Sequence, residues 1–188
     1  MADDASAAGS NETEVSGPTF ALSPALATDD VIDYTSKAGA TIWREATTKL
    51  SDETFDCDAN NMRDFLELLR TRAETMGWDN SVLAIPTDPE HPEGEVKDFF
   101  KHYGKLTMGN LRTVAQIYVG SQTRFAQDSM QLYKCLHNSL SKIGRDKVTL
   151  HRDTYTQGGQ PEGILQLKTI IQQSHIDTNA TTSAISHA

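Results

Sequence analysis

Oxygen-bearing side chains between residues 56 and 67 match most of the spacing of a calcium-binding EF-hand loop. Two positions break the pattern, because Asn61 replaces the glycine of the sharp turn and Arg63 replaces the usual hydrophobic residue. The apolar stripe of a helix already begins at Met62, inside the loop, and no second loop exists for pairing. We therefore predict a helix start, where the helix dipole favours Asp, and no specific calcium site. The matching residues, at loop positions 1, 3, 5, 9 and 12, are Asp56, Asp58, Asn60, Asp64 and Glu67.

The remaining reactive side chains form no known catalytic or metal-binding pattern. Cys57 and Cys135 are far apart and form no CxxC pair, which predicts buried free thiols rather than a disulfide or a zinc site. No GxSxG, Walker or dinucleotide motif occurs. We therefore expect no catalytic residue, no cofactor, no metal ion and no small-molecule substrate. None of the histidines belongs to an HExxH motif or stands at ligand spacing from a cysteine: His91, His102, His137, His151, His175 and His187.

Positive charge is concentrated between residues 134 and 152. Five basic side chains against one acidic side chain, Asp146, leave this stretch with a net charge of +4. Such a surface can contact nucleic-acid phosphates, although a solvated helix face and turn is the favoured explanation of these charges. The candidate nucleic-acid contacts are Lys134, Lys142, Arg145, Lys147 and Arg152.

The chain as a whole is acidic, with 188 residues and a formal net charge of −9 at pH 7. Residues 1–30 carry six acidic residues and no Lys or Arg, so the rest of the chain is close to neutral. This balance excludes a basic footprint over the whole domain. No apolar run approaches the roughly 18 residues of a membrane span, and the N-terminus lacks a signal-peptide pattern. We expect a cytoplasmic protein with no membrane partner.

Composition and periodicity predict one all-α domain of about six or seven helices. Residues 1–29 are expected to be a disordered acidic leader, residues 30–176 the helical domain, and residues 177–188 an incomplete helix or a disordered end. No stretch alternates with the period of a strand. The clearest stripe runs from Met62 to Met76 and stops at Gly77. Three other helices are expected over about 31–50, 96–103 and 108–120. The longest helix is expected to begin at 121 or 123, to include Ile143 in its stripe and to end at Gly144. One or two turns over 145–152 and a helix that begins at Pro161 follow.

Two strings of residues resemble a known family of assembly proteins. Residues 127–136 read QDSMQLYKCL and are followed by NSL at 138–140, and residues 170–182 read IIQQSHIDTNATT. Together with Phe65-Leu66, Arg72-Ala73 and Gly77-Trp78, they resemble the N-terminal part of Gag-like polyproteins of copia-type long-terminal-repeat retrotransposons, in particular a microalgal branch. The resemblance extends over residues 30–183.

The resemblance implies a helical, capsid-forming protein that assembles into particles around the element's RNA. Its expected partners are other copies of itself and RNA, and its expected place is a cytoplasmic virus-like particle. Family polyproteins usually continue into a zinc knuckle, a protease, an integrase and a reverse transcriptase, none of which this sequence contains. The alternatives are a host helical adaptor that binds a partner in a groove, and, less favoured, a calcium sensor.

Aromatic side chains outside the main stripes suggest apolar surface that remains after the domain has folded. Trp43, Trp78 and Tyr155 are the main examples. We expect such surface to support weak self-association, as the small contacts of a capsid lattice would.

Overall fold

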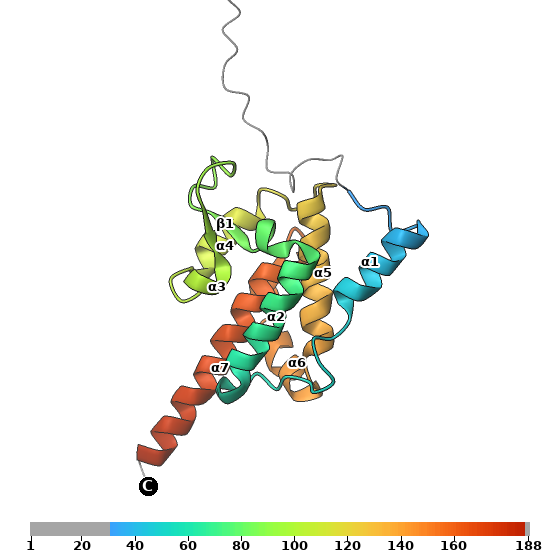
Figure 1. The fold of residues 1–188 in the computed structure, drawn as a ribbon. Coiled ribbons are helices and arrows are strands. Elements are labelled where there is room, and N and C mark those ends of the chain that lie inside the picture. The colour runs from blue at the N-terminus through green and yellow to red at the C-terminus, as the bar shows by residue number, and fades with distance from the viewer. Residues whose placement is uncertain (1–30, 187–188) are drawn as a thin grey trace, which may run out of the picture.

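The computed structural model describes the backbone of residues 31–186 and the side-chain surroundings of residues 31–175 (Figure 1). The expected leader, residues 1–29, lies outside the described part. The helices are α1 (Lys37–Thr47), α2 (Met62–Met76), α3 (Phe99–His102), α4 (Met108–Ala115), α5 (Arg124–Ser139), α6 (Lys142–Thr149) and α7 (Gly163–Ser186), with single 3₁₀ turns η3 (Ala59–Asn61), η4 (Trp78–Asn80) and η5 (Arg152–Tyr155).

The described chain is mostly helical, as predicted, but it is not purely α-helical. Two short antiparallel pairs join β1 (Ala84–Pro86) to β2 (Val96–Asp98) and β3 (Thr156–Gln157) to β4 (Gln160–Pro161). In the first pair Ala84 lies opposite Asp98. Strands of two or three residues are too short to show an alternating pattern, so periodicity alone could not reveal them.

The core is built around α5 and α7, which pack side by side behind α2 (Figure 1). The first turns of α7 are buried on all sides, and Ile164, Leu165 and Leu167 are fully enclosed. Gly163 permits this approach, because a Cβ at this position would lie 2.5 Å from the backbone oxygen of Ser129. The first half of α7 is therefore the central helix of the core, although its buried residues include the polar Gln166, Lys168 and Thr169.

The end of α5 corrects a predicted helix boundary. The predicted helix continued through Ile143 to Gly144, but α5 ends at Ser139 and Leu140 is extended. The cause is a tertiary contact, since the backbone N–H of Phe55 donates to the Ser139 carbonyl at 2.9 Å. A new helix, α6, starts behind the Ser141 cap, and Gly144 lies buried in its first turn against the Phe55 backbone.

Several further boundaries differ from the predictions. The helices expected over about 31–50 and 108–120 are shorter, as α1 and α4. Val96 belongs to β2 rather than to the helix of Phe99. Pro161 ends β4 and α7 begins at Gly163, so the proline is not the first helical residue. Within the described chain α7 is longer than α5 and continues through residues 177–186, where its end projects from the body (Figure 1). In contrast, α2 has the predicted bounds, and Gly77 adopts the left-handed conformation with φ of 78°.

Candidate functional site

The five predicted nucleic-acid contacts lie on three consecutive elements. Lys134 is on α5, and Lys142, Arg145 and Lys147 are on α6. Arg152 opens η5. The reversal of the chain after Ser139 brings the end of α5 next to α6, and all five side chains are exposed except Lys147, which is half-buried.

Three of these cations act electrostatically on one imidazole. The pKa of His137 is lowered, first by its burial and then by the positive charges of Arg145, Lys134 and Arg152. We call Lys134, His137, Arg145 and Arg152 the basic corner. Lys142 is less available, because its Nζ lies 2.8 Å from the Asp146 carboxylate.

An aromatic ring that the sequence reasoning did not single out belongs to this corner. The centroid of Tyr133 lies 6.0 Å from that of His137. The Lys134 Nζ lies 5.6 Å from the Tyr133 ring centroid, within cation–π range. The spacing of four residues between Tyr133 and His137 was the available signal, because such residues are neighbours on a helix surface.

The exposed face of α6 carries two large aliphatic side chains. Ile143 is 59% exposed and Leu150, which caps the helix, is 84% exposed. They are seven residues apart and therefore share one face. The predicted burial of Ile143 is wrong, because α6 is a separate helix that packs through Gly144 and Val148. We call Ile143 and Leu150 the α6 apolar pair.

The aromatics that were expected to remain at the surface are mostly internal. Trp78 is fully buried and its Nε1 donates to Gln131 Oε1 at 3.2 Å. Tyr155 is only 4% exposed. Trp43 is half-buried and packs edge-on against Tyr34, with 5.0 Å between the ring centroids. The expectation of leftover aromatic surface is therefore wrong for Trp78 and Tyr155.

The segment that resembled an EF-hand loop forms the start of α2. Asp58 accepts a hydrogen bond from the Asn60 N–H at 2.9 Å and so caps η3. Asp64 lies in the first turn of α2, and Glu67 pairs with Arg63 at 3.8 Å. Within the part of the chain that the structure describes, no three His, Cys, Asp or Glu side chains gather as metal ligands would. That this segment binds no calcium stays a prediction.

Both cysteines are buried free thiols, as the sequence predicts. Burial raises the pKa of the Cys135 thiol to about 11. Because the thiolate is the reactive form, this side chain is a poor nucleophile at neutral pH.

Two buried carboxylates form hydrogen bonds at α5, Asp128 from α5 itself and Glu162 from the residue before α7. Asp128 accepts hydrogen bonds from Ser81 Oγ at 2.7 Å and from Arg124 Nε at 2.8 Å. Glu162 accepts from Ser129 Oγ at 2.6 Å. Burial raises the pKa of both carboxyl groups. These residues connect α5 to its neighbours, and sequence reasoning had placed Ser129 merely in an apolar stripe.

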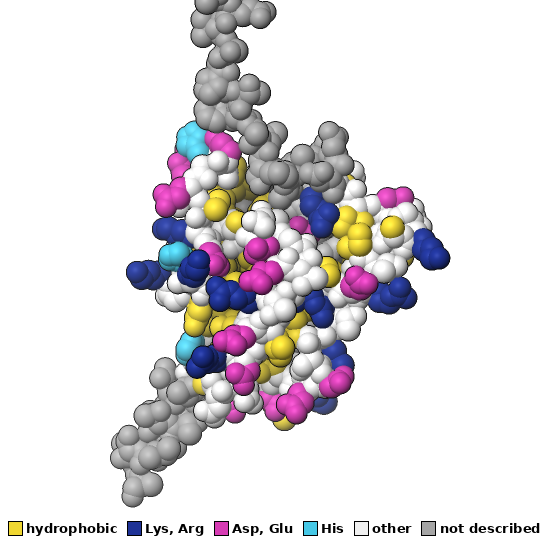
Figure 2. Space-filling view, viewed as in Figure 1, with side chains coloured by type: hydrophobic (Ala, Val, Ile, Leu, Met, Phe, Trp, Pro, Cys, Tyr) yellow, Lys and Arg dark blue, Asp and Glu magenta, His cyan; other side chains and the backbone are white. Residues whose placement is uncertain are grey.

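The charge pattern of the surface is local rather than global. On the face shown in Figure 2, basic and acidic side chains are intermingled, with hydrophobic side chains between them. No helix among residues 31–186 has both the length and the apolar character that crossing a bilayer requires.

No model of a protein family, no curated protein and no solved structure matches this chain.

Proposed function

We propose that this chain is a non-enzymatic assembly protein of the Gag-like kind, which associates with itself and contacts RNA. The observation that carries the proposal is the combination, at α5, α6 and η5, of the basic corner with the exposed α6 apolar pair. The resemblance of residues 30–183 to copia-type Gag sequences agrees with this role.

The basic corner has the chemistry that a single RNA strand requires. Arg145, Arg152 and Lys134 can neutralise phosphates and release their counterions. Tyr133 and His137 offer rings on which an unpaired base can stack, a contact that tolerates any sequence. We therefore propose single-stranded RNA, bound without strong sequence preference, as the nucleic-acid partner.

The RNA contact is tested with Arg145→Gln/Arg152→Gln and an oligouridine strand. We expect weaker binding. The slope of log K against log salt concentration should become shallower by about 1.4, because each lost phosphate contact to a single strand reduces the slope by about 0.7. Fluorescence anisotropy at several salt concentrations measures both quantities.

The matched control is Lys37→Gln/Lys105→Gln, which removes two exposed positive charges from α1 and from the segment before α4. This variant should retain most of the binding. An equal loss of RNA affinity in both variants would mean that RNA binding depends only on the net charge of the protein. The basic corner would then have no specific role in binding.

A second candidate, a helical adaptor, is favoured by a groove on another face. A cavity of about 400 Å³ lies between α2, α3 and α7, lined by Met62, Leu66, Phe100 and Tyr103 among others. Its apolar floor and its border of Arg63, Glu67 and Arg70 suit an amphipathic helix of a partner. A chain that stays monomeric at millimolar concentration and does not respond to salt or RNA would favour this candidate over assembly.

A further inference from the structure

A second cavity, unrelated to the basic corner, lies under the β1–β2 hairpin. Its volume is about 240 Å³, and it is enclosed by η4, both strands, the hairpin loop, the end of α4 and the start of α5. This is somewhat smaller than the roughly 300–1,000 Å³ of a typical drug-sized site. A ligand for this cavity must therefore be small.

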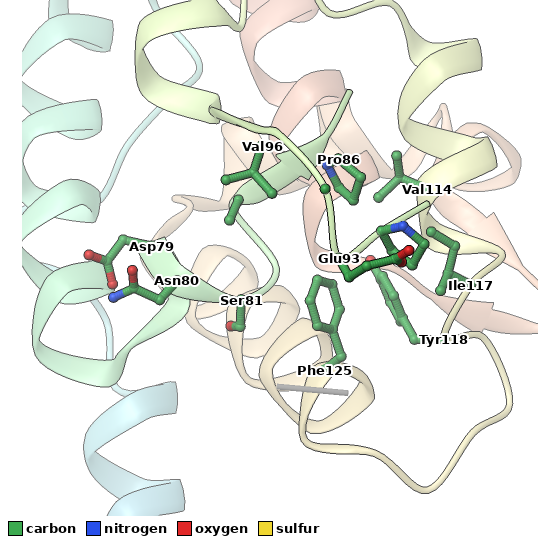
Figure 3. A pocket seen from close by; sticks show the side chains of 13 residues that line it. Asp79, Asn80, Ser81, Pro86, Glu93, Val96, Val114, Ile117, Tyr118 and Phe125 are labelled. Carbon is green, nitrogen blue, oxygen red and sulfur yellow. The ribbon is translucent and has the colours of Figure 1, made fainter. Parts of the chain in front are cut away.

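The walls of the cavity are largely apolar and its floor is aromatic. Val96, Val114 and Ile117 contribute aliphatic surface. Tyr118 and Phe125 lie beneath, with 4.6 Å between their ring centroids. In Figure 3 the Phe125 ring lies between Ser81 and Glu93, with Tyr118 beside it.

The charged groups around this cavity all have one sign. Asp79 and Glu93 contribute carboxylates, Asn80 and Ser81 are polar, and no Lys, Arg or His is among the lining residues. Asp79 forms no ion pair within residues 31–175. Glu93 is paired with the exposed His91 at 3.5 Å, an imidazole that is charged only when protonated.

Ser81 is the polar group at the inner wall, and its hydroxyl is already engaged. Its Oγ donates a hydrogen bond to the buried Asp128 carboxylate, which also accepts a hydrogen bond from the half-buried Arg124, so the positive charge of Arg124 is paired behind the wall. The carboxylate nearest the aromatic floor is that of Glu93, because the Asp79 carboxylate is directed away from Phe125 and Tyr118 (Figure 3). A cleft of one sign with low-dielectric walls concentrates ions of the opposite sign.

We propose that this cavity binds a small organic cation, an ammonium group attached to an apolar body. The apolar body fills the space above Phe125 and Tyr118, and the ammonium group lies at the rim near Glu93. The inference is independent of the proposed assembly role, which uses the opposite end of α5.

The test uses phenethylammonium chloride, with 2-phenylethanol and phenylacetate as neutral and anionic analogues of nearly the same shape. We expect saturable chemical-shift changes at the backbone amides of Ser81, Gly94 and Phe125 in the full chain with the ammonium compound, weaker binding of the alcohol and none of the acid. Raising the salt concentration should weaken the binding of the ammonium compound.

Three variants locate the site. Val96→Trp, at a position 49% exposed, should fill the cavity and abolish the shifts. Glu93→Gln should weaken binding about two- to fivefold, the range for an exposed ion pair. Glu90→Gln removes the same charge from the same loop outside the cavity and should leave binding unchanged. Equal affinity for the alcohol, equal weakening by Glu90→Gln, or the absence of saturable shifts would overturn the proposal.

Discussion

At the scale of single residues, Glu162 shows how polar chemistry is accommodated in this core. It is 6% exposed and accepts a hydrogen bond from Ser129 at 2.6 Å. The Tyr118 hydroxyl is close enough to lower the pKa of Glu162, although it forms no hydrogen bond of full geometry. Burial is nevertheless the largest effect and raises the pKa of the carboxyl group. The ionised form therefore costs stability that the protonated form does not.

This shift predicts how Glu162→Gln changes the pH dependence of stability. A carboxyl group whose pKa is raised in the folded state contributes stability below its ordinary value, 4.5, and loses it as pH rises through the folded value. The variant has no such loss. In the wild type, ionisation of Glu162 lowers the free energy of unfolding between pH 4 and pH 7. We expect Glu162→Gln to remove this contribution, so the variant should gain stability relative to the wild type as the pH rises from 4 to 7. Urea titrations at both pH values measure the difference.

The control for this experiment is Glu53→Gln, which removes an exposed carboxylate before α2. Its effect on the free energy of unfolding should stay within about 0.5 kcal/mol at both pH values, as for most surface substitutions. The assigned cause would be contradicted if the difference in free energy of unfolding between the wild type and Glu162→Gln were the same at pH 4 and pH 7.

At the scale of elements, α5 and α6 demonstrate how one predicted stripe separates into two different faces. Leu132 is fully buried against the start of α7. A Cβ added at Gly163 would lie 2.8 Å from the Cβ of Leu132. Ile143 belonged to the same predicted stripe, yet it is exposed on α6. The break at Leu140 rotates the chain, so the two residues no longer share a face.

Paired substitutions test this separation. Leu132→Ala should lower the free energy of unfolding by roughly 2–5 kcal/mol, because it removes buried methyl groups and leaves a cavity against α7. Ile143→Ala should change it by less than about 0.5 kcal/mol, as an exposed substitution. Thermal and urea unfolding provide the measurement. Equal costs would place Ile143 in the core and would argue for a continuous helix through Gly144.

At the scale of the whole molecule, the proposed self-association depends on the α6 apolar pair. We expect the chain to be mostly monomeric at micromolar concentration and to associate at higher concentration. Ile143→Ser/Leu150→Ser should weaken association about tenfold or more, since burial of one aliphatic side chain contributes about 1.5–3 kcal/mol. Sedimentation velocity over a range of concentrations measures the dissociation constant.

A matched variant and a change of salt concentration distinguish this contact from nonspecific hydrophobic association. Leu68→Ser removes another exposed aliphatic side chain, 43% exposed on α2, and should leave association unchanged. The acidic residues 1–28 should repel neighbouring copies, so raising salt or deleting them should favour association. Association that is insensitive to the α6 substitutions would place the interface elsewhere.

Local sequence patterns by themselves determined the helical class and several of its parts. The stripe from Met62 to Met76 and the stop at Gly77 predicted α2 with its observed bounds. The two distant cysteines predicted buried free thiols. The grouping of cations between residues 134 and 152 predicted a nucleic-acid contact, and that contact stays a prediction. These features depend on neighbours within one or two helical turns, and so one sequence contains enough information for them.

Tertiary contacts alone decided the rest. The hydrogen bond from Phe55 to Ser139 marks the end of α5, and 84 residues of sequence separate its partners. The local signal at this place is Ser141, which caps the next helix. Beyond this break, the α6 apolar pair is exposed, and the charges of Arg145 and Arg152 act on His137. Trp78 and Tyr155 are internal because distant segments cover them. The cavity under the hairpin likewise requires five segments to meet, and such long-range packing cannot be read from the periodicity of any one of them.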